Sequence, residues 1–302
     1  MNLVKKAQLF KQKTMTGLAA MATSAALLVA PLTTASVAEA ATFGPLSINA
    51  NYTGTDSADI KGTNGDLSTQ TFTFDASYGF ATFIYSNTQY DFSGVGEDPF
   101  DSLEKVAVDL HHNGYITSNL AYGVGLTLGA LYEEDFDVGD SYNVSPRMTF
   151  GWTFSNGMTA FFGGYANFNG ADNVYLPIIG LKLGDEKDLG WMGSLAYPAT
   201  MVQYRFNSLL AVGASFMTVR DTYHLDDDVS VKGSWADGYL REESYGVGVH
   251  ATLTPVQHLK LTAGIFSYFD REFKVYDNGG DEIDSFETDN SYGAFVRGGF
   301  VF

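Results

Sequence analysis

The chain has 302 residues, a formal net charge of −18, no cysteine, and aromatic side chains at 15% of positions. So acidic a protein is a poor partner for nucleic acid, because both carry negative charge. Without cysteine, disulfides contribute nothing to its stability.

The first 40 residues have the layout of a secretory signal peptide. A basic segment contains Lys5, Lys6, Lys11 and Lys13, an apolar stretch runs from Met15 to Ala30, and Ala38-Glu39-Ala40 is a small-x-small cleavage site. The apolar stretch is shorter than the ~20 residues that a membrane-spanning helix needs. We therefore predict a signal peptide over 1–40, with a retained anchor as the alternative, and one mature domain over 41–302.

Alternating polar and apolar residues dominate the rest of the chain, and no later segment has ~18 consecutive apolar residues. A transmembrane strand needs about 9–11 residues. Alternating runs of about this length, separated by turn residues, predict strands over 44–53, 69–78, 81–92, 104–115, 120–133, 142–155, 158–168, 174–183, 191–197, 200–206, 209–221, 240–254, 258–274 and 288–302. The predicted fold is an all-β, antiparallel transmembrane barrel of 14 strands.

The connections between these strands alternate in length. Short ones cover 78–80, 117–119, 156–157, 184–190, 207–208 and 254–257, and mostly longer ones cover 54–68, 93–103, 134–141, 169–173, 222–239 and 275–287. Short periplasmic turns and long outer loops are typical of outer-membrane barrels. The segment around Pro198 interrupts the rhythm, because proline cannot donate to a sheet ladder. If the two short strands beside it do not span, the barrel has 12 strands.

The two faces of each strand differ in polarity. Tyr122, Val124, Leu126 and Leu128, for example, alternate with glycine and threonine. A charge facing lipid would cost about 2–4 kcal/mol, so the polar faces should point into the lumen. The lumen-lining candidates are Asp75, Lys105, Asp109, His111, Arg147, Gln203, Arg205, His250, Lys260 and Arg297. They could form either a salt-bridge network that stiffens the wall or a solute-selective lining.

The last strand, 292–302, alternates and ends on an aromatic residue. Tyr292, Ala294, Val296, Gly298, Phe300 and Phe302 share one face, and the opposite face carries Arg297. This segment resembles the closing strand of Gram-negative outer-membrane β-barrels. The resemblance implies export through the periplasm, residence in the outer membrane, and recognition of Phe300 and Phe302 by the barrel-assembly machinery.

The long loops are rich in carboxylates, which are the ligands that hard cations prefer. The candidate cation ligands are Asp226, Asp227, Asp228, Asp277, Asp281 and Asp284. Such loops could hold Ca²⁺ or Mg²⁺ shared with lipopolysaccharide, favour cations at a pore mouth, or simply be solvated.

Our favoured hypothesis is that the protein is a porin-like channel for small hydrophilic solutes with a cation preference. The expected partners are outer-membrane lipid, lipopolysaccharide, the assembly machinery, divalent cations and the solutes. We expect a monomer that needs no cofactor and is not an enzyme. The alternatives are a non-conducting barrel that displays acidic loops and, less favoured, a hydrolase using His224 near Asp226 and Asp228.

Overall fold

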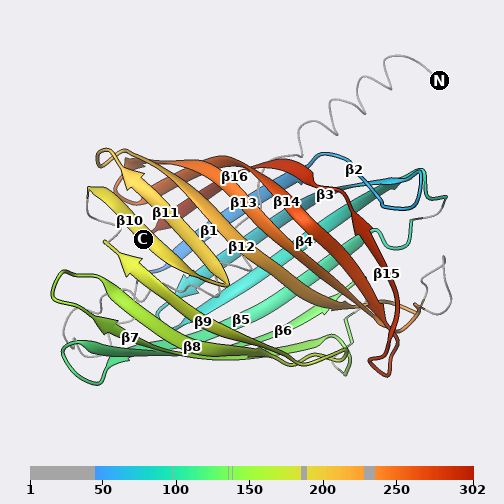
Figure 1. Ribbon diagram of the computed structural model, residues 1–302, viewed down its shortest axis with the longest axis horizontal. Helices are drawn as coiled ribbons and strands as arrows, with labels where there is room; N and C mark the ends of the chain where they lie inside the picture. Colours follow the sequence, from blue (N-terminus) through green and yellow to red (C-terminus); the bar gives the residue numbers. More distant parts are fainter. Residues whose placement is uncertain (1–44, 97, 135, 138, 185–188, 228–234) are drawn as a thin grey trace, which may run out of the picture.

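The protein is an all-β closed barrel in the computed structural model, which describes residues 45–302 except 97, 135, 138, 185–188 and 228–234 (Figure 1). The predicted signal peptide, 1–40, lies outside the described residues. No helix in the described part is long and apolar enough to cross a membrane.

The wall has fourteen antiparallel strands, as the sequence predicts. The assigned strands are β1 (Ser47–Thr55), β2 (Ala58–Asp59), β3 (Asp66–Tyr78), β4 (Ala81–Ser93), β5 (Ser102–Tyr115), β6 (Leu120–Tyr132), β7 (Tyr142–Thr153), β8 (Thr159–Asn167), β9 (Val174–Leu183), β10 (Gly190–Tyr197), β11 (Ala199–Arg205), β12 (Leu210–His224), β13 (Tyr239–Val256), β14 (Leu259–Tyr276), β15 (Glu282–Thr288) and β16 (Ser291–Val301). Two wall strands are interrupted: β1 continues into β2, and β15 continues into β16. β1 pairs with both β3 and β16, which closes the ring.

The twelve-strand alternative is wrong, because both short strands beside Pro198 pair into the wall. β10 pairs with β9 and β11, and β11 pairs with β12. The prediction that 275–287 is wholly loop is also wrong, since β15 pairs with the outer end of β14. Phe273 and Val275 of β14 are fully buried on the inner face. Their packing stabilises the hairpin beyond the length that a membrane requires.

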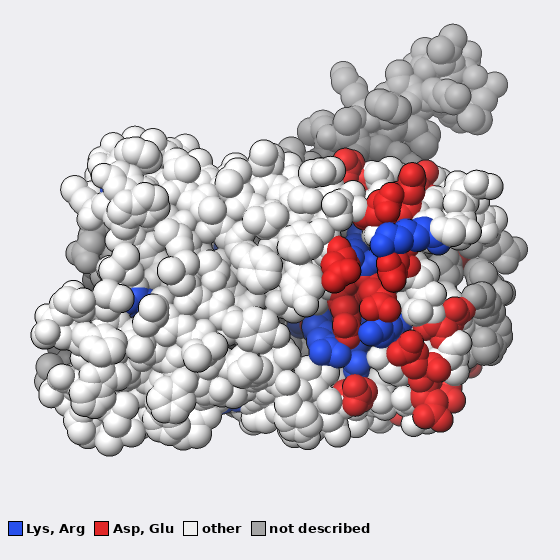
Figure 2. Space-filling model, in the orientation of Figure 1, with Lys and Arg blue, Asp and Glu red and all other residues white. Residues whose placement is uncertain are grey.

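The outward faces carry the apolar side chains that the alternation predicts. Val124 and Leu128 of β6 and Val247 and Val249 of β13 are exposed. Figure 2 shows that, on the side in view, this surface is almost free of charge and that the charged residues gather at one end. Lys61–Glu287, Arg220–Glu243 and Lys274–Glu272 are ion pairs at that end. An uncharged band beside a charged end suits a barrel wall in lipid.

An apolar core fills the interior at the end of the barrel with the long loops, here called the outer end. Its buried members are Ile60, Leu67, Tyr90, Phe92, Phe100, Leu103, Leu131, Tyr223, Leu225, Trp235, Leu240, Phe273 and Val275. Phe273 stacks on Phe286 with a centroid distance of 4.6 Å, and Phe100 meets Tyr90 edge-on at 4.9 Å. Leu225 and Trp235 belong to segment 222–239, whose described ends thus fold inward. We name this group the outer core.

The outer core exists because the barrel is pinched at this end. His224 at the end of β12 forms a parallel bridge with Tyr132 at the end of β6. The Glu133 amide donates to the His224 carbonyl oxygen at 3.0 Å, and the Asp226 amide donates to Glu133 Oε2 at 3.1 Å. This pinch closes a smaller ring from β12 through β14, β16, β1 and β3 to β6. Strands β7 to β11 lie outside that ring and form a side lobe (Figure 1).

The pinch makes stability depend on pH through Glu133. Burial raises the pKa of this carboxyl to about 7, although the hydrogen bond from the Asp226 amide opposes part of the rise. The folded-state pKa of Glu133 lies above the ordinary value of 4.5. The contribution of this carboxyl to the free energy of unfolding is therefore complete below about pH 4.5 and is lost as pH rises through 7. We expect the urea midpoint of the folded barrel to fall between pH 5 and pH 8, and Glu133→Gln to remove most of that fall. Glu134→Gln, at the exposed neighbouring position, is the control, and an equal effect of both variants would contradict the assignment.

Candidate functional site: a polar pocket between the side lobe and β12

A pocket lies where the side lobe meets β12. One wall of the pocket is formed by lumen-facing residues of β5 to β8, and we call it the inner wall. The opposite wall, here called the outer wall, is formed by Val174 and Leu176 of β9, Pro198, and Thr218, Arg220 and Thr222 of β12. The cavity has a volume of about 60 Å³, which is room for a few water molecules. The pinch creates this pocket, because it turns the outer end of β12 toward the inner faces of the lobe.

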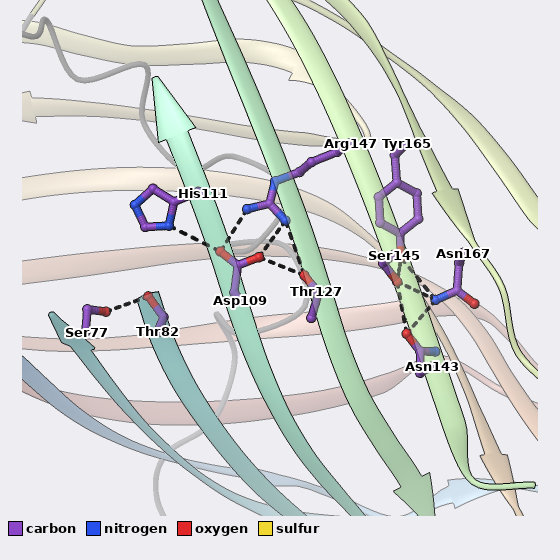
Figure 3. Close-up of polar contacts among 10 residues, drawn as sticks. All are labelled: Ser77, Thr82, Asp109, His111, Thr127, Asn143, Ser145, Arg147, Tyr165 and Asn167. Carbon is purple, nitrogen blue, oxygen red and sulfur yellow. Dashed lines mark hydrogen bonds and ion pairs between the residues drawn. The ribbon is translucent and has the colours of Figure 1, made fainter. Parts of the chain in front are cut away.

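A buried ion pair stands at the inner edge of the pocket (Figure 3). Arg147 on β7 binds Asp109 on β5 with two hydrogen bonds, Nη1 to Oδ1 at 2.7 Å and Nη2 to Oδ2 at 2.8 Å. The Thr127 hydroxyl donates to Asp109 Oδ1 at 2.7 Å, and His111 Nδ1 lies 3.4 Å from Oδ2. The side chains of Asp109 and Arg147 are only 4% and 8% exposed. Gly125 faces the guanidinium, and a side chain there would collide with it.

Neutral hydrogen-bonding groups continue the inner wall toward the outer end. Asn167 donates to Asn143 Oδ1 and to Ser145 Oγ, each at 2.8 Å, and Tyr165 donates to Ser145 Oγ at 3.2 Å. Asn169 in turn donates to Asn167 Oδ1 at 2.6 Å. Figure 3 shows Asn143 and Ser145 of β7 and Tyr165 and Asn167 of β8 converging on one another. They form an uncharged polar surface that can exchange hydrogen bonds with a solute.

Three more of the predicted lumen residues, Lys105, Asp75 and Arg297, form ion pairs across or along the lumen. Lys105 reaches Asp221 on β12 at 2.9 Å. Asp75 lies 3.5 Å from Arg297 and accepts a hydrogen bond from Asn49 at 2.6 Å. Most of the charged lumen residues are therefore paired, and whether they stiffen the wall or select solutes stays open.

The remaining predicted lumen residues lie toward the inner end, where Gln203 and His250 approach each other from either side of Gly213. Gln203 donates to the sulfur of Met192, His250 stands across from Gly213, and Arg205 is half-buried. Lys260 is exposed at the inner mouth beside Gly299. These side chains are more accessible than Asp109 and Arg147.

The carboxylates predicted to bind cations do not assemble into a site within the described residues, where no group of three or more metal-ligand side chains occurs. Asp277 instead accepts from the Asp281 amide within its own turn, and Asp284 accepts from the Ser285 amide. Asp226 accepts from the Glu134 amide, and Asp227 is exposed. Asp228 lies outside the described residues.

The terminal aromatic residues stand at the seam of the barrel. The Phe302 amide donates to the Leu46 carbonyl oxygen, and its ring lies 4.7 Å from that of Phe300. Both side chains are exposed. Their recognition by the assembly machinery stays a prediction.

His224 is a buried residue of the pinch rather than an exposed loop residue. Its Nε2 lies 3.2 Å from Asp237, a residue that sequence reasoning did not select. Sequence reasoning also missed a buried group around Arg271, which donates to Glu242 at 2.8 Å, while Tyr90 donates to the same carboxyl at 2.9 Å. The inward parity of Glu242 on β13 could have been found from the sequence, but Arg271 faces inward only because a bulge in β14 shifts the register there, which alternation alone does not reveal.

Comparisons with known proteins agree with the fold alone. No protein-family model matches the chain, and no curated protein does. The solved structures that resemble it include the toluene transporter TodX of Pseudomonas putida (11% identity, 94% of this chain and 95% of that chain, TM-score 0.33) and OprB of the same organism (9%, 86% and 94%, 0.31). The outer membrane protease OmpT of Escherichia coli also matches (9%, 86% and 94%, 0.26). Likeness this remote carries no argument about solute or activity.

The wall itself defines the class. A closed ring of fourteen antiparallel strands with an uncharged, apolar outer band and a polar lumen is a transmembrane barrel of the outer-membrane type. The chain is therefore a transmembrane β-barrel protein by its fold.

The Asp109–Arg147 pair should behave as a buried unit. Arg147→Met leaves a buried carboxylate without its counter-charge, and we expect it to lower the free energy of unfolding by about 3–5 kcal/mol. Adding Asp109→Asn should recover most of that loss, because neither charge then stays unpaired. Urea unfolding in lipid vesicles measures both values.

Arg220→Met is the control for this cycle, since its partner Glu243 is half-exposed. It should cost about 1 kcal/mol or less. Additive losses in the Asp109→Asn, Arg147→Met double variant would contradict the coupling.

Proposed function

We propose that this barrel is a channel for small hydrophilic solutes, with its outer exit closed in the conformation described. The observation that carries the proposal is the set of polar side chains that face the lumen between the inner mouth and the pocket, beside a buried apolar patch of Met217, Phe266 and Phe295. Asn49, Asp75 and Arg297 line the inner part of the lumen, and Asp109 and Arg147 lead into the pocket. Small solutes can exchange water for these polar groups.

The outer exit is closed in two places. The outer core fills the ring that the pinch creates. The side lobe is covered by residues 168–173, here called the cap loop. Arg241 on β13 holds this loop, because its Nη1 lies 3.3 Å from Asp172 Oδ2 and its Nη2 donates to the Asp172 carbonyl oxygen at 3.4 Å. Arg241 is buried, but the Asp172 side chain is 55% exposed.

The cap loop is the weaker of the two closures. Its contact with Arg241 is a half-exposed ion pair, whereas the outer core packs aromatic and aliphatic side chains from several strands. Surface-accessible pairs contribute about 0.2–1 kcal/mol, while emptying a core position costs several times more. Releasing the cap loop therefore costs less free energy than opening the outer core. That movement would connect the pocket with the outside.

We assign the proposed cation preference to the outer rim. The lumen carboxylates Asp75 and Asp109 are each paired with an arginine, so they offer little net attraction for a cation. The outer loops carry many more carboxylates than basic residues. Charged groups at a pore mouth bias the local ion concentration over about one Debye length.

A second possible function is that of a non-conducting anchor that displays acidic loops. The outer core is the observation that supports it. A packed interior at the outer end stabilises the display of loops whether or not solutes pass. This alternative expects that neutralising Asp226, Asp227 and Asp228 changes surface binding of cations or lipopolysaccharide without altering permeability.

Single-channel recording in a planar bilayer tests the channel proposal. The wild-type barrel should open rarely, and Asp172→Ala should raise the open probability roughly fivefold, because the lost ion pair contributes about 1 kcal/mol to the closed state. Asp98→Ala removes the same charge from another outer loop and should leave the open probability unchanged.

A salt gradient in the same recordings gives the ion selectivity. A reversal potential toward the cation equilibrium value supports the assignment to the outer rim. Silence of both the wild-type barrel and Asp172→Ala would contradict the channel and favour the anchor.

A further inference from the structure

The barrel wall is incomplete beside the pocket. The β10–β11 hairpin is short, and its turn at Pro198 ends between β9 and β12 (Figure 1). β9 pairs with β10 only over 179–183, and β12 pairs with β11 only over 211–217, followed by one bond from the Thr218 amide to the Pro198 carbonyl oxygen. Among the described residues, 174–178 of β9 and 219–223 of β12 have no strand partner on the sides that face the hairpin.

This opening lies at the outer boundary of the membrane. Tyr175 on β9, Tyr197 at the hairpin turn and Tyr245 beside Thr218 all face outward and are exposed, Tyr175 by 68%. Tyrosine marks the membrane–water interface of outer-membrane barrels. Unpaired strand edges at membrane depth are tolerated only where protein covers them or where they line a water-filled cavity. The space between β9 and β12 therefore needs polar content of its own.

The pocket behind the opening changes polarity with depth. Val174, Leu176 and Pro198 line the outer side, while Asn143, Ser145 and Asn167 line the inner side. The charged side chains that line the pocket are already paired: Arg147 with Asp109, Lys105 with Asp221, and Arg220 with Glu243. The groups that remain to bind a ligand are therefore uncharged. Amide and hydroxyl groups line the bottom of the pocket, and Val174, Leu176 and Pro198 form an apolar collar at its entrance.

We propose that the opening between β9 and β12 is a lateral portal that admits small uncharged amphipathic molecules from the outer membrane interface into the pocket. A hydroxyl or similar polar head binds the asparagine and serine side chains, and the apolar tail stays in the collar and the lipid. The volume of about 60 Å³ accommodates a head group of a few heavy atoms, not a phospholipid head. The portal is a route distinct from the axial one, and its test does not depend on conductance.

Single-cysteine variants test the portal cleanly, because the chain has no cysteine of its own. Leu176→Cys and Val174→Cys place thiols on the collar. Thr262→Cys is the matched control: it faces the lumen on β14, where both neighbouring strands pair without a break. The barrels are reconstituted in vesicles, folding is checked by heat-modifiable migration, and a dodecyl maleimide is dissolved in the bilayer.

We expect the two collar cysteines to react several times faster than Thr262→Cys. Added 1-octanol should slow their reaction severalfold, while the same concentration of glycerol should not. Rates equal to that of Thr262→Cys would overturn the portal. Fast labelling without protection by octanol would overturn the assignment of the occupant, since it would mean that bilayer lipid alone fills the opening.

Discussion

Backbone hydrogen bonding in lipid is the constraint on which the rest of this structure depends. A strand in a membrane must pair on both edges, so the wall closes through β1, which pairs with β3 and β16. Closure fixes which face of every strand meets lipid and which faces the lumen. The same constraint explains why the unpaired edges of β9 and β12 stand beside a pocket with polar groups rather than in bare hydrocarbon.

The pinch between β6 and β12 decides what the lumen can hold. A complete ring of fourteen strands leaves free interior space, whereas a ring of about eight strands is filled by its own side chains. By joining His224 to Tyr132, the chain makes a smaller ring at the outer end, and the outer core fills it. The strands left outside that ring enclose the pocket. One contact therefore produces both the seal and the candidate site.

Much of this architecture can be predicted from the sequence, because the alternation of inward and outward side chains along a strand depends only on neighbouring residues. All fourteen wall strands follow from alternation and turn residues, and the inward parity of Asp109 and Arg147 follows from their strands. The pinch is not readable in this way, since it depends on the non-local contact of His224 with Tyr132. The outer core could be suspected in part from apolar residues such as Leu240 at inward positions, but the inward position of Phe273 depends on the bulge in β14. The partners of Lys105 and Arg241 could not, because Asp221 and Asp172 meet them across the barrel.

The central claim is a polar lumen that is open at the inner end and sealed at the outer end. Ser145→Cys, deep in the pocket, tests it most directly when a charged, membrane-impermeant maleimide is added to either side of vesicles that hold the barrel in one orientation. We predict labelling from the inner side and little from the outer side. Equal rates from both sides would show that neither the outer core nor the cap loop seals the lumen, and would contradict this account.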